Sequence, residues 1–475
     1  MQDIIRESTA DEIDSAVAKA AAAGPAWAAS DAAARSALLR KLAEGLEAGR
    51  EQLVALANEE TVLGPVRLNG ELDRTAFQLR AFADAVDAGD PFQAIEDAAV
   101  PGAPPAGRPH LLRVNVPLGP VAMFSASNFP FAFSVLGGDT ASALAAGCPV
   151  VVKAHPAHPR LSRAVYALAL ESVQACGAPD GVIGMVEGAT KEVGIRLVRH
   201  PAIEAVAFTG SFAGGAALQK EVQGRDKPIP FYGELGSINP IVALPAALRE
   251  KGPELAKTLA ASIALGCGQF CTSPGVLIVL DSDATDSFVR LLAEEMDAQA
   301  PHAMLSPTIR TAFDSGVARL VSHAAARRLT RSEQDPGRNP VPNLVEVDIA
   351  AFIAHPELRH EIFGPSCLVM KARTVAEAQQ ALQAVGGSLT ATVWGAESGD
   401  ADARAIVGAA MSMAGRVLFS GVPTGVAVTR AQHHGGPWPA STAPQTTSVG
   451  LMAMQRFLRP VALQDAPAWL VGDYR

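Results

Sequence analysis

The chain has 475 residues, of which 49% are hydrophobic and 18% charged, and it carries a formal net charge of -9. This length exceeds what one hydrophobic core supports, so two or three domains are expected. The negative charge disfavours nucleic acid and anionic membranes as partners. The 5 cysteines are scattered and odd in number, which is typical of free thiols in a reducing compartment. None has zinc-site spacing, so no metal is expected.

The amino-terminal stretch MQDIIRESTADEID is polar and acidic, and it has no apolar core of a secretory signal. The longest apolar tract, AFSVLGGDTASALAAGCPVVV, contains Asp139 and several glycines, which makes it a poor membrane span. A soluble cytoplasmic protein is therefore the expectation.

Residues 8–90 have the apolar spacing of helices, and the first helix is expected to start at Ser8 with Glu12 close behind. Residues 31–60 form a second helical stretch, and GELDRTAFQLRAFADAV a third. The third helix carries Arg74 and Gln78, which lie four residues apart and share a face. Such a pair is usually solvated surface, and contact with a polar substrate is the alternative.

After a Pro-, Ala- and Gly-rich connection over residues 91–110, strands and helices alternate as far as residue 245. Short loops between them predict a parallel, doubly wound sheet that binds ligands at the carboxyl ends of its strands. A second α/β region follows over about residues 250–430. The segments HLLRVNV and SVGLMAMQRFLRPVALQ have the pattern of strands and are expected to form an extension that pairs with another subunit.

Three residues near predicted strand ends or turns are candidates for a catalytic role. Cys271 follows a helical segment and precedes the strand GVLIV, which suits either a fixed nucleophile or a small buried residue. Glu234 ends an apolar strand, where burial is expected to raise its pKa toward the range of a general base; an ion pair is the alternative. Asn128 follows another strand, where its amide suits either an oxyanion or a turn.

The segment FTGSFAGG, residues 208–215, is a glycine-rich turn between a predicted strand and helix, which favours phosphate binding, although its spacing is not GxGxxG. Lys153 ends another strand, where a lysine either caps the strand or binds ribose hydroxyls. No carboxylate occurs among the five residues that follow Lys153, so no acid there would repel the 2′-phosphate of a dinucleotide. His155 and Arg160 are further cations in this segment.

Six motifs in order give the chain a strong resemblance to the aldehyde dehydrogenase superfamily over nearly its whole length: SNFPFAFS, VVVKAHPAHP, FTGS, ELGSINP, GQFCTSPG and EIFGP. Within it, FYGELGSINP, GQFCTSPG and HHGGPWPAS are most similar to the α-ketoglutaric semialdehyde (2,5-dioxovalerate) dehydrogenases. The NADP-dependent fatty aldehyde dehydrogenases are the next most similar branch. The resemblance implies an aldehyde dehydrogenase fold, with a Rossmann-like cofactor domain, an α/β catalytic domain and a small β extension.

The resemblance also implies catalytic roles. Cys271 would attack the aldehyde, Asn128 would hold the oxyanion and Glu234 would activate the water that hydrolyses the thioester. His434 matches a histidine near the nicotinamide, and packing of this histidine on Trp438 is the alternative. Arg74 and Gln78 would lie at the mouth of the substrate tunnel and bind a substrate carboxylate.

For the cofactor, the resemblance implies that Lys153 and Glu361 hold ribose hydroxyls and that Phe363 lies near the nicotinamide. The glycine-rich turn would meet the pyrophosphate through Gly210, Ser211 and Gly215. The family's acid at the third position after the lysine is Pro156 here, so NADP is expected to be preferred and NAD to be possible.

The expected domains are a cofactor-binding domain of residues 1–105 and 120–240, a catalytic domain of 241–432, and oligomerisation strands at 106–119 and 453–470 of a homodimer or homotetramer. The expected reaction is oxidation of 2,5-dioxopentanoate to 2-oxoglutarate, with medium- or long-chain fatty aldehydes as the alternative substrates. A Cys/His hydrolase and an inactive binding or structural protein are alternatives of other classes. Asn128, Glu234 and Cys271 are expected to converge between the two α/β regions, with Cys267 as a packing residue.

Overall fold

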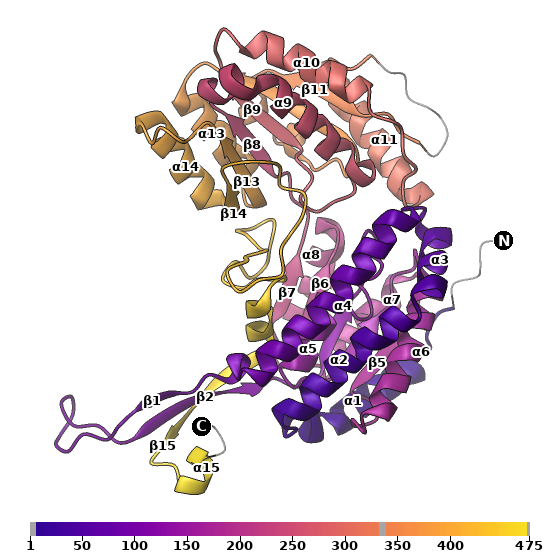
Figure 1. The fold of residues 1–475 in the computed structure, drawn as a ribbon, viewed down its shortest axis with the longest axis vertical. Helices are drawn as coiled ribbons and strands as arrows, with labels where there is room; N and C mark the ends of the chain where they lie inside the picture. Colours follow the sequence, from indigo (N-terminus) through magenta and orange to yellow (C-terminus); the bar gives the residue numbers. More distant parts are fainter. Residues whose placement is uncertain (1–5, 332–338, 473–475) are drawn as a thin grey trace.

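The computed structural model describes residues 6–331 and 339–472 and arranges them around three sheets (Figure 1). The first sheet is parallel, in the order β5-β4-β3-β6-β7, which confirms the predicted doubly wound sheet. Its strands are β3 (Val121–Phe124), β4 (Val150–Lys153), β5 (Ile183–Val186), β6 (Ala205–Thr209) and β7 (Phe231–Glu234).

Helices cover both faces of this sheet because successive side chains of each strand point to opposite sides. Val121 and Met123 pack on one face against α2, α4, α5 and α6, while Ala122 and Phe124 pack on the other against α1, α7 and α8. These helices are α1 (Ala10–Ala28), α2 (Ala32–Ala48), α4 (Pro65–Asp87), α5 (Gly138–Ala145), α6 (Pro159–Ala175), α7 (Lys191–Arg199) and α8 (Phe212–Gln223).

Two details of the amino-terminal helices differ from the sequence prediction. The N-cap of α1 is Thr9, which forms a capping box with Glu12, whereas Ser8 bonds the main chain of Glu187. The expected helix over residues 31–60 is broken at Gly49, so that α3 (Arg50–Thr61) follows α2 as a separate helix. Glycine weakens a helix interior, which explains the break.

The second sheet has the order β10-β11-β12-β9-β8-β13-β14 and is parallel except for β10 at its edge. Helices again cover both faces, with α9 and α10 on one and α12, α13 and α14 on the other. The strands are β8 (Pro240–Ala243), β9 (Val276–Leu280), β10 (Ala326–Arg328), β11 (Asn343–Val347), β12 (Ser366–Ala372), β13 (Ser388–Trp394) and β14 (Ala414–Leu418). The helices are α9 (Pro245–Ala264), α10 (Thr285–Asp297), α11 (Pro307–Val321), α12 (Ile349–Ala354), α13 (Val375–Val385) and α14 (Ala401–Met413).

The third sheet projects from the body of the molecule (Figure 1). In it β2 (Leu111–Pro117) lies between β1 (Ile95–Asp97) and β15 (Leu458–Gln464), both antiparallel to it. The strand predicted for residues before 458 is wrong, because Leu451–Phe457 forms the 3-10 helix η4. Arg456 ties η4 to α5 through a buried ion pair with Asp139 at 2.6 Å. The short helices η1 (Asp90–Phe92), η2 (Leu265–Gly268), η3 (Pro356–Arg359) and α15 (Ala468–Gly472) complete the fold. None of the helices within the described ranges combines the length and apolar character needed to cross a bilayer.

Candidate active site

The loop that carries Cys271 begins where α9 ends at Ala264. Gly266, Cys267 and Gly268 then adopt positive φ angles of 56°, 60° and 64°, which end the helix and reverse the chain. A side chain at Gly268 would lie 2.3 Å from the main chain of Gly364, so only glycine allows this loop to pack against Gly364. The thiol of Cys267 is buried and bonds the His302 carbonyl at 3.2 Å, which confirms it as a packing residue.

Three side chains from distant segments meet at the end of this loop. The Sγ atom of Cys271 lies 3.5 Å from Nε2 of His434, which in turn lies 3.0 Å from Oε1 of Glu234. Glu234 is the last residue of β7, and His434 belongs to the long connection after β14. Ser448 donates a hydrogen bond to the other oxygen of Glu234 at 2.5 Å. The carboxylate, imidazole and thiol therefore form one contiguous chain of titratable groups.

His434 is 1% exposed, and its main-chain N–H bonds Thr447. Packing on Trp438 is wrong for this histidine, because Trp438 is 52% exposed and packs edge-on against Phe212 instead. Nδ1 of His434 is buried and, among the described residues, has no hydrogen-bond partner. Nε2 is thus the ring nitrogen that faces both the thiol and the carboxylate.

Burial and the neighbouring Glu234 carboxylate raise the pKa of the Cys271 thiol well above its ordinary value. The expectation of a raised pKa for Glu234 is wrong. Burial does push it upward, but His434, with Ser448, stabilises the carboxylate and leaves the pKa of Glu234 lowered. The resting state is therefore a protonated thiol beside an ionised carboxylate, with His434 between them.

Asn128 reaches the same place from the loop after β3. Its amide donates to the carbonyl of Gln269 at 3.0 Å, and it lines one cavity together with Cys271 and Glu234. An amide carries two N–H groups, so one remains to hold developing negative charge on a reacting oxygen. Asn128, Glu234 and Cys271 converge as the sequence predicted.

This cavity has a volume of about 790 Å³ and runs along the carboxyl ends of the first sheet. Of the predicted cofactor residues, five line it: Pro156, Gly210, Ser211, Glu361 and Phe363. Ser211 caps the N-terminus of α8, where the helix dipole favours an anion. Its size, its helix N-terminus and its carboxylate suit a pyrophosphate flanked by ribose hydroxyls, so the residues fit a nicotinamide dinucleotide.

Two predicted cofactor residues lie outside the described lining of this cavity. A side chain at Gly215 would come within 2.1 Å of Leu235, so this glycine serves close packing of α8. Lys153 directs its ammonium group to the carbonyls of Ala154, at 3.0 Å, and Gly188, and burial lowers its pKa to about 8.

The two further cations expected near Lys153 are also not free. Burial lowers the pKa of His155 well below its ordinary value, which leaves the ring neutral. Arg160 is paired with Glu59 at 2.9 Å. Of these three residues, Lys153 could still offer a positive charge to a ligand. To do so, its ammonium group would have to leave the carbonyls of Ala154 and Gly188.

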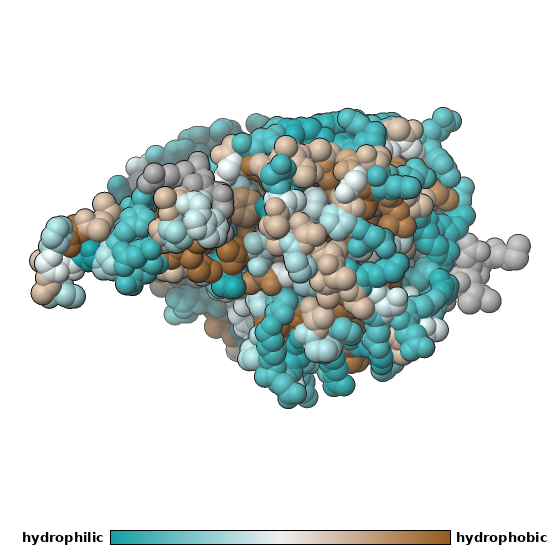
Figure 2. Space-filling view, turned by 90° about the horizontal axis from the view of Figure 1, so that it is seen from below, coloured by the Kyte–Doolittle hydropathy of each residue, from teal (hydrophilic) through white to brown (hydrophobic). Residues whose placement is uncertain are grey.

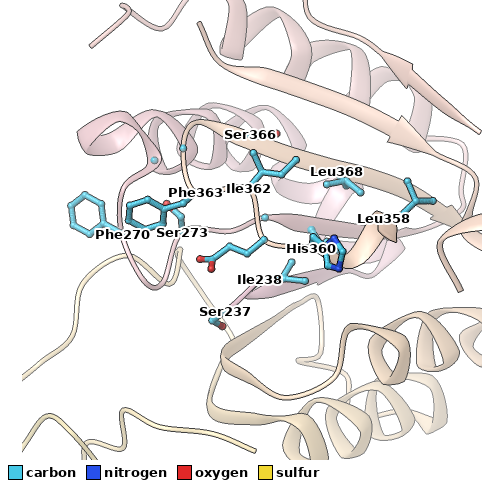
Figure 3. Close-up of a pocket in the computed structure, with 15 residues that line it drawn as sticks. Ser237, Ile238, Phe270, Ser273, Leu358, His360, Ile362, Phe363, Ser366 and Leu368 are labelled. Carbon is cyan, nitrogen blue, oxygen red and sulfur yellow. The ribbon is translucent and has the colours of Figure 1, made fainter. Parts of the chain in front are cut away.

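Glu361 and Phe363 come from the loop between η3 and β12, which packs against the loop of Cys271 (Figure 3). Figure 3 shows Phe363 beside Phe270 and Ser273, around a gap of only about 20 Å³, which has room for about one water molecule. This close packing fixes Phe363 next to the thiol loop. Although its side chain faces the large cavity, the surrounding protein raises the pKa of Glu361 to about 7.

A second cavity of about 320 Å³ also reaches Cys271, and Cys271 is the one described lining residue that it shares with the large cavity. Its walls are largely apolar, and α4 contributes Arg67 and Arg74. Gln78 lies outside the described lining and is only 2% exposed. Its side chain packs against Gly138, the first residue of α5. The predicted contact of Gln78 with substrate is therefore wrong, because α4 places this side chain against α5 and not in the cavity. Sequence reasoning missed Arg67, although its spacing of seven residues from Arg74 places both on one helix face.

The two arginines are held by carbonyls and aromatic rings rather than by ionised acids. Arg67 donates to the Asn128 carbonyl at 2.6 Å and lies over the ring of Phe270. Arg74 donates to the Val426 carbonyl at 3.3 Å. The acid between them, Glu71, has its pKa raised by burial, which favours its neutral form. Two guanidinium groups therefore face one carboxyl group in this cavity, which leaves a net positive charge beside the thiol even when Glu71 is ionised.

A thiol that separates a small-molecule cavity from a nucleotide-type cavity is the arrangement of a thiol-dependent dehydrogenase. Residues 3–436 match the aldehyde dehydrogenase family, and the chain belongs to that family. It is therefore an NAD(P)-dependent oxidoreductase.

Two relatives are similar over most of their length. α-Ketoglutaric semialdehyde dehydrogenase 2 of Azospirillum brasilense is 42% identical over 94% of this chain and 86% of its own. The α-ketoglutaric semialdehyde dehydrogenase of Acinetobacter baylyi is 38% identical, over 99% and 89%. A structure of a Thermus thermophilus 1-pyrroline-5-carboxylate dehydrogenase variant shares the fold, with a TM-score of 0.81, 21% identity and coverage of 96% and 86%.

Proposed function

We propose that this protein oxidises the aldehyde group of 2,5-dioxopentanoate (α-ketoglutaric semialdehyde) and releases 2-oxoglutarate. The observation that carries the proposal is the cavity at Cys271, where the two guanidinium groups of Arg67 and Arg74 face the single carboxyl group of Glu71. Both relatives named above are dehydrogenases of this substrate.

The two cations distinguish this substrate from a fatty aldehyde. A buried cation is costly unless a partner neutralises it, and an alkyl chain would leave two arginines with only one acid between them. A carboxylate would accept charge-assisted hydrogen bonds from them. Nη1 of Arg67 is buried beside Gly266 and, among the described residues, lacks a hydrogen-bond partner.

In the first half of the reaction, Sγ of Cys271 adds to the aldehyde carbon while Nε2 of His434 gives its proton to the Glu234 carboxylate and accepts the thiol proton. The imidazole is the relay, and Glu234, whose Oε1 lies 3.0 Å from Nε2, holds the proton until it is released to solvent. The amide of Asn128 and the main-chain N–H of Cys271 hold the oxyanion of the thiohemiacetal. The residues that line the large cavity would hold a nicotinamide dinucleotide, which would supply a hydride acceptor, and the oxidised adduct would remain on Cys271 as a thioester.

In the second half, water attacks the thioester carbon and Glu234 takes its proton, directly or through His434. Breaking the C–S bond releases the carboxylic acid, and the thiolate of Cys271 regains a proton from His434. A family member that transfers its acyl group to coenzyme A has no need of such a base, so the buried Glu234 supports the hydrolytic branch.

NADP is the preferred cofactor in this proposal, and NAD is accepted. Pro156 provides no carboxylate to repel a 2′-phosphate. The carboxylate of Glu7 interacts electrostatically with Lys153. It already accepts hydrogen bonds from the main-chain N–H groups of Ala189 and Thr190, at 2.6 and 3.0 Å. Fluorescence titration of both cofactors tests this preference, and tighter binding of NAD would contradict it.

The projecting sheet is proposed to join subunits into a homodimer or homotetramer. Apolar side chains, brown in Figure 2, gather where this sheet meets the body of the molecule, and Ile95 and Trp469 are 56% and 69% exposed. Sedimentation equilibrium tests this, and a monomer at micromolar concentration would refute it.

The substrate is tested with 2,5-dioxopentanoate, succinic semialdehyde, pentanal and decanal, each with NAD and NADP. The expected result is the highest kcat/KM for the dioxo acid. Arg74→Met should lower that value by about 10- to 100-fold, the loss of one charge-assisted hydrogen bond, and leave pentanal within about threefold. Equal loss for both aldehydes would show that Arg74 does not recognise the carboxylate.

A further inference from the structure

The three groups at the centre of the site also have the composition of a transition-metal site. Sγ of Cys271, Nε2 of His434 and a carboxylate oxygen of Glu234 all lie within 4.8 Å of one another. Sulfur, imidazole nitrogen and carboxylate oxygen are the ligands that Zn²⁺ takes in proteins. The set escapes a search for local cysteine and histidine spacing because its members come from three distant segments of the chain.

The separations between these atoms already suit a tetrahedral ion. Bonds of about 2.3 Å to sulfur and about 2.0 Å to nitrogen and oxygen place the S and N ligands about 3.5 Å apart and the N and O ligands about 3.3 Å apart. The corresponding separations here are 3.5 Å between Cys271 and His434 and 3.0 Å between His434 and Glu234. The third separation, between Sγ of Cys271 and the carboxylate oxygen of Glu234, is within 4.8 Å.

Neighbouring groups hold the ligands in this geometry. Ser448 binds the second oxygen of Glu234, and Thr447 binds the main chain of His434. Partners of this kind orient metal ligands and strengthen binding. Because Nε2 faces the other two ligands, Nδ1 would carry the ring proton when Nε2 binds the metal.

Charge and access favour an ion as well. A thiolate and a carboxylate together balance a divalent ion, so burial of the filled site leaves no net charge. Cys271 lines both the arginine-bearing cavity and the large cavity, so a fourth, exchangeable ligand can approach. The soft sulfur and the nitrogen select Zn²⁺ or Co²⁺ over Mg²⁺ and Ca²⁺.

We propose that Cys271, His434 and Glu234 form a zinc-binding site whose occupation sequesters the thiol and reversibly inhibits the enzyme. Binding releases the thiol proton, Cys–SH + Zn²⁺ → Cys–S–Zn⁺ + H⁺, so no oxidant or reductant is needed. Inhibition should be competitive with aldehyde, because the ion occupies the sulfur lone pair that attacks the carbonyl carbon.

A second cluster, His323, His355 and Glu357, also brings three ligand atoms within 4.8 Å. His355 and Glu357 are solvent-exposed, and Nδ1 of His355 lies 3.3 Å from Glu357. Any experiment must separate metal bound at this surface cluster from metal bound at the thiol. His355→Gln removes the surface cluster without touching the active site.

The test uses the untagged full-length protein without added cofactor, titrated with ZnCl₂ by calorimetry and with CoCl₂ by absorption spectroscopy. Wild type and His355→Gln should both bind one tight equivalent, and Co²⁺ should produce a thiolate-to-metal charge-transfer band. Cys271→Ser should abolish the band, and His434→Gln should weaken Zn²⁺ binding by at least about 100-fold. Cys267→Ala, which removes the neighbouring buried thiol, should retain both signals.

A band that persists in Cys271→Ser, or tight binding lost in His355→Gln, would overturn the proposal. Circular dichroism of each variant identifies misfolding, and Glu234→Gln supplies a further ligand deletion if one variant fails to fold. Inhibition is measured separately on the wild-type holoenzyme, with reversal by EDTA. Because binding is read without turnover, failure of 2,5-dioxopentanoate as a substrate leaves this test intact.

Discussion

Replacement of His434 by glutamine probes how the thiol is activated. Glutamine has a similar length and its amide can still donate to Glu234, but it cannot accept the proton of Cys271. Without an acceptor 3.5 Å from Sγ, the thiol, whose pKa is already raised by burial and by Glu234, must ionise unaided. Loss of a positioned base costs about 10²- to 10⁴-fold in kcat/KM, or about 3–5 kcal/mol.

The same variant should change the pH dependence in a defined direction. The pKa of Glu234 is lowered in the wild type because His434 outweighs burial, so the carboxylate stays ionised until the pH falls below its ordinary range. Without the imidazole, burial is less strongly opposed and the pKa of Glu234 rises. Protonation then occurs at higher pH, and the acid limb of the kcat profile moves upward.

The assay is steady-state kinetics over a pH series, with His433→Gln as the matched control from the adjacent position. His433 is half-buried and makes no described contact with Cys271 or Glu234. The reasoning fails if His434→Gln keeps kcat/KM within about threefold of wild type and leaves the acid limb in place. It also fails if the control shows the same loss.

Three further variants test other parts of the structure. Gly215→Ala should lower stability by about 1–3 kcal/mol through overlap with Leu235, seen as a lower thermal midpoint, and unchanged cofactor affinity would separate packing from binding. Because the pKa of Glu361 is about 7, cofactor affinity measured by fluorescence should fall as the pH drops from 8 to 6, and Glu361→Gln should remove that dependence. Arg456→Met should cost about 3–5 kcal/mol by leaving Asp139 buried without its partner, and thermal denaturation close to that of wild type would contradict this.

Much of the site was predictable because each of its residues marks the end of a regular element. Glu234 ends an apolar strand, Asn128 follows another, and Cys271 follows a helix that stops at small residues. In a parallel sheet the carboxyl ends of the strands share one edge, so residues that end different strands approach one another. The glycine-rich turn was placed correctly for the same reason, although Gly215 proved to serve packing.

Other features of the structure depend on the packing of helices and strands that lie far apart in the sequence. Gln78 and Arg67 lie on the same helix as Arg74, and only the position of α5 decides that Gln78 is covered while Arg67 faces the cavity. Likewise, Arg456 of η4 meets Asp139 of α5 only because the two elements pack together in the folded chain. Local apolar spacing carries no information about either contact.

The sequence alone determined the two α/β regions, the projecting strands, the family and the thiol, because these follow from periodicity and from motifs within single segments. Only the tertiary structure decided the electrostatics of the site. Whether the pKa of Glu234 ends above or below its ordinary value depends on a histidine 200 positions away in the chain, whose Nε2 lies 3.0 Å from the carboxylate. The energy of a charge depends on the distance to its neighbours in space, which the order of residues does not specify.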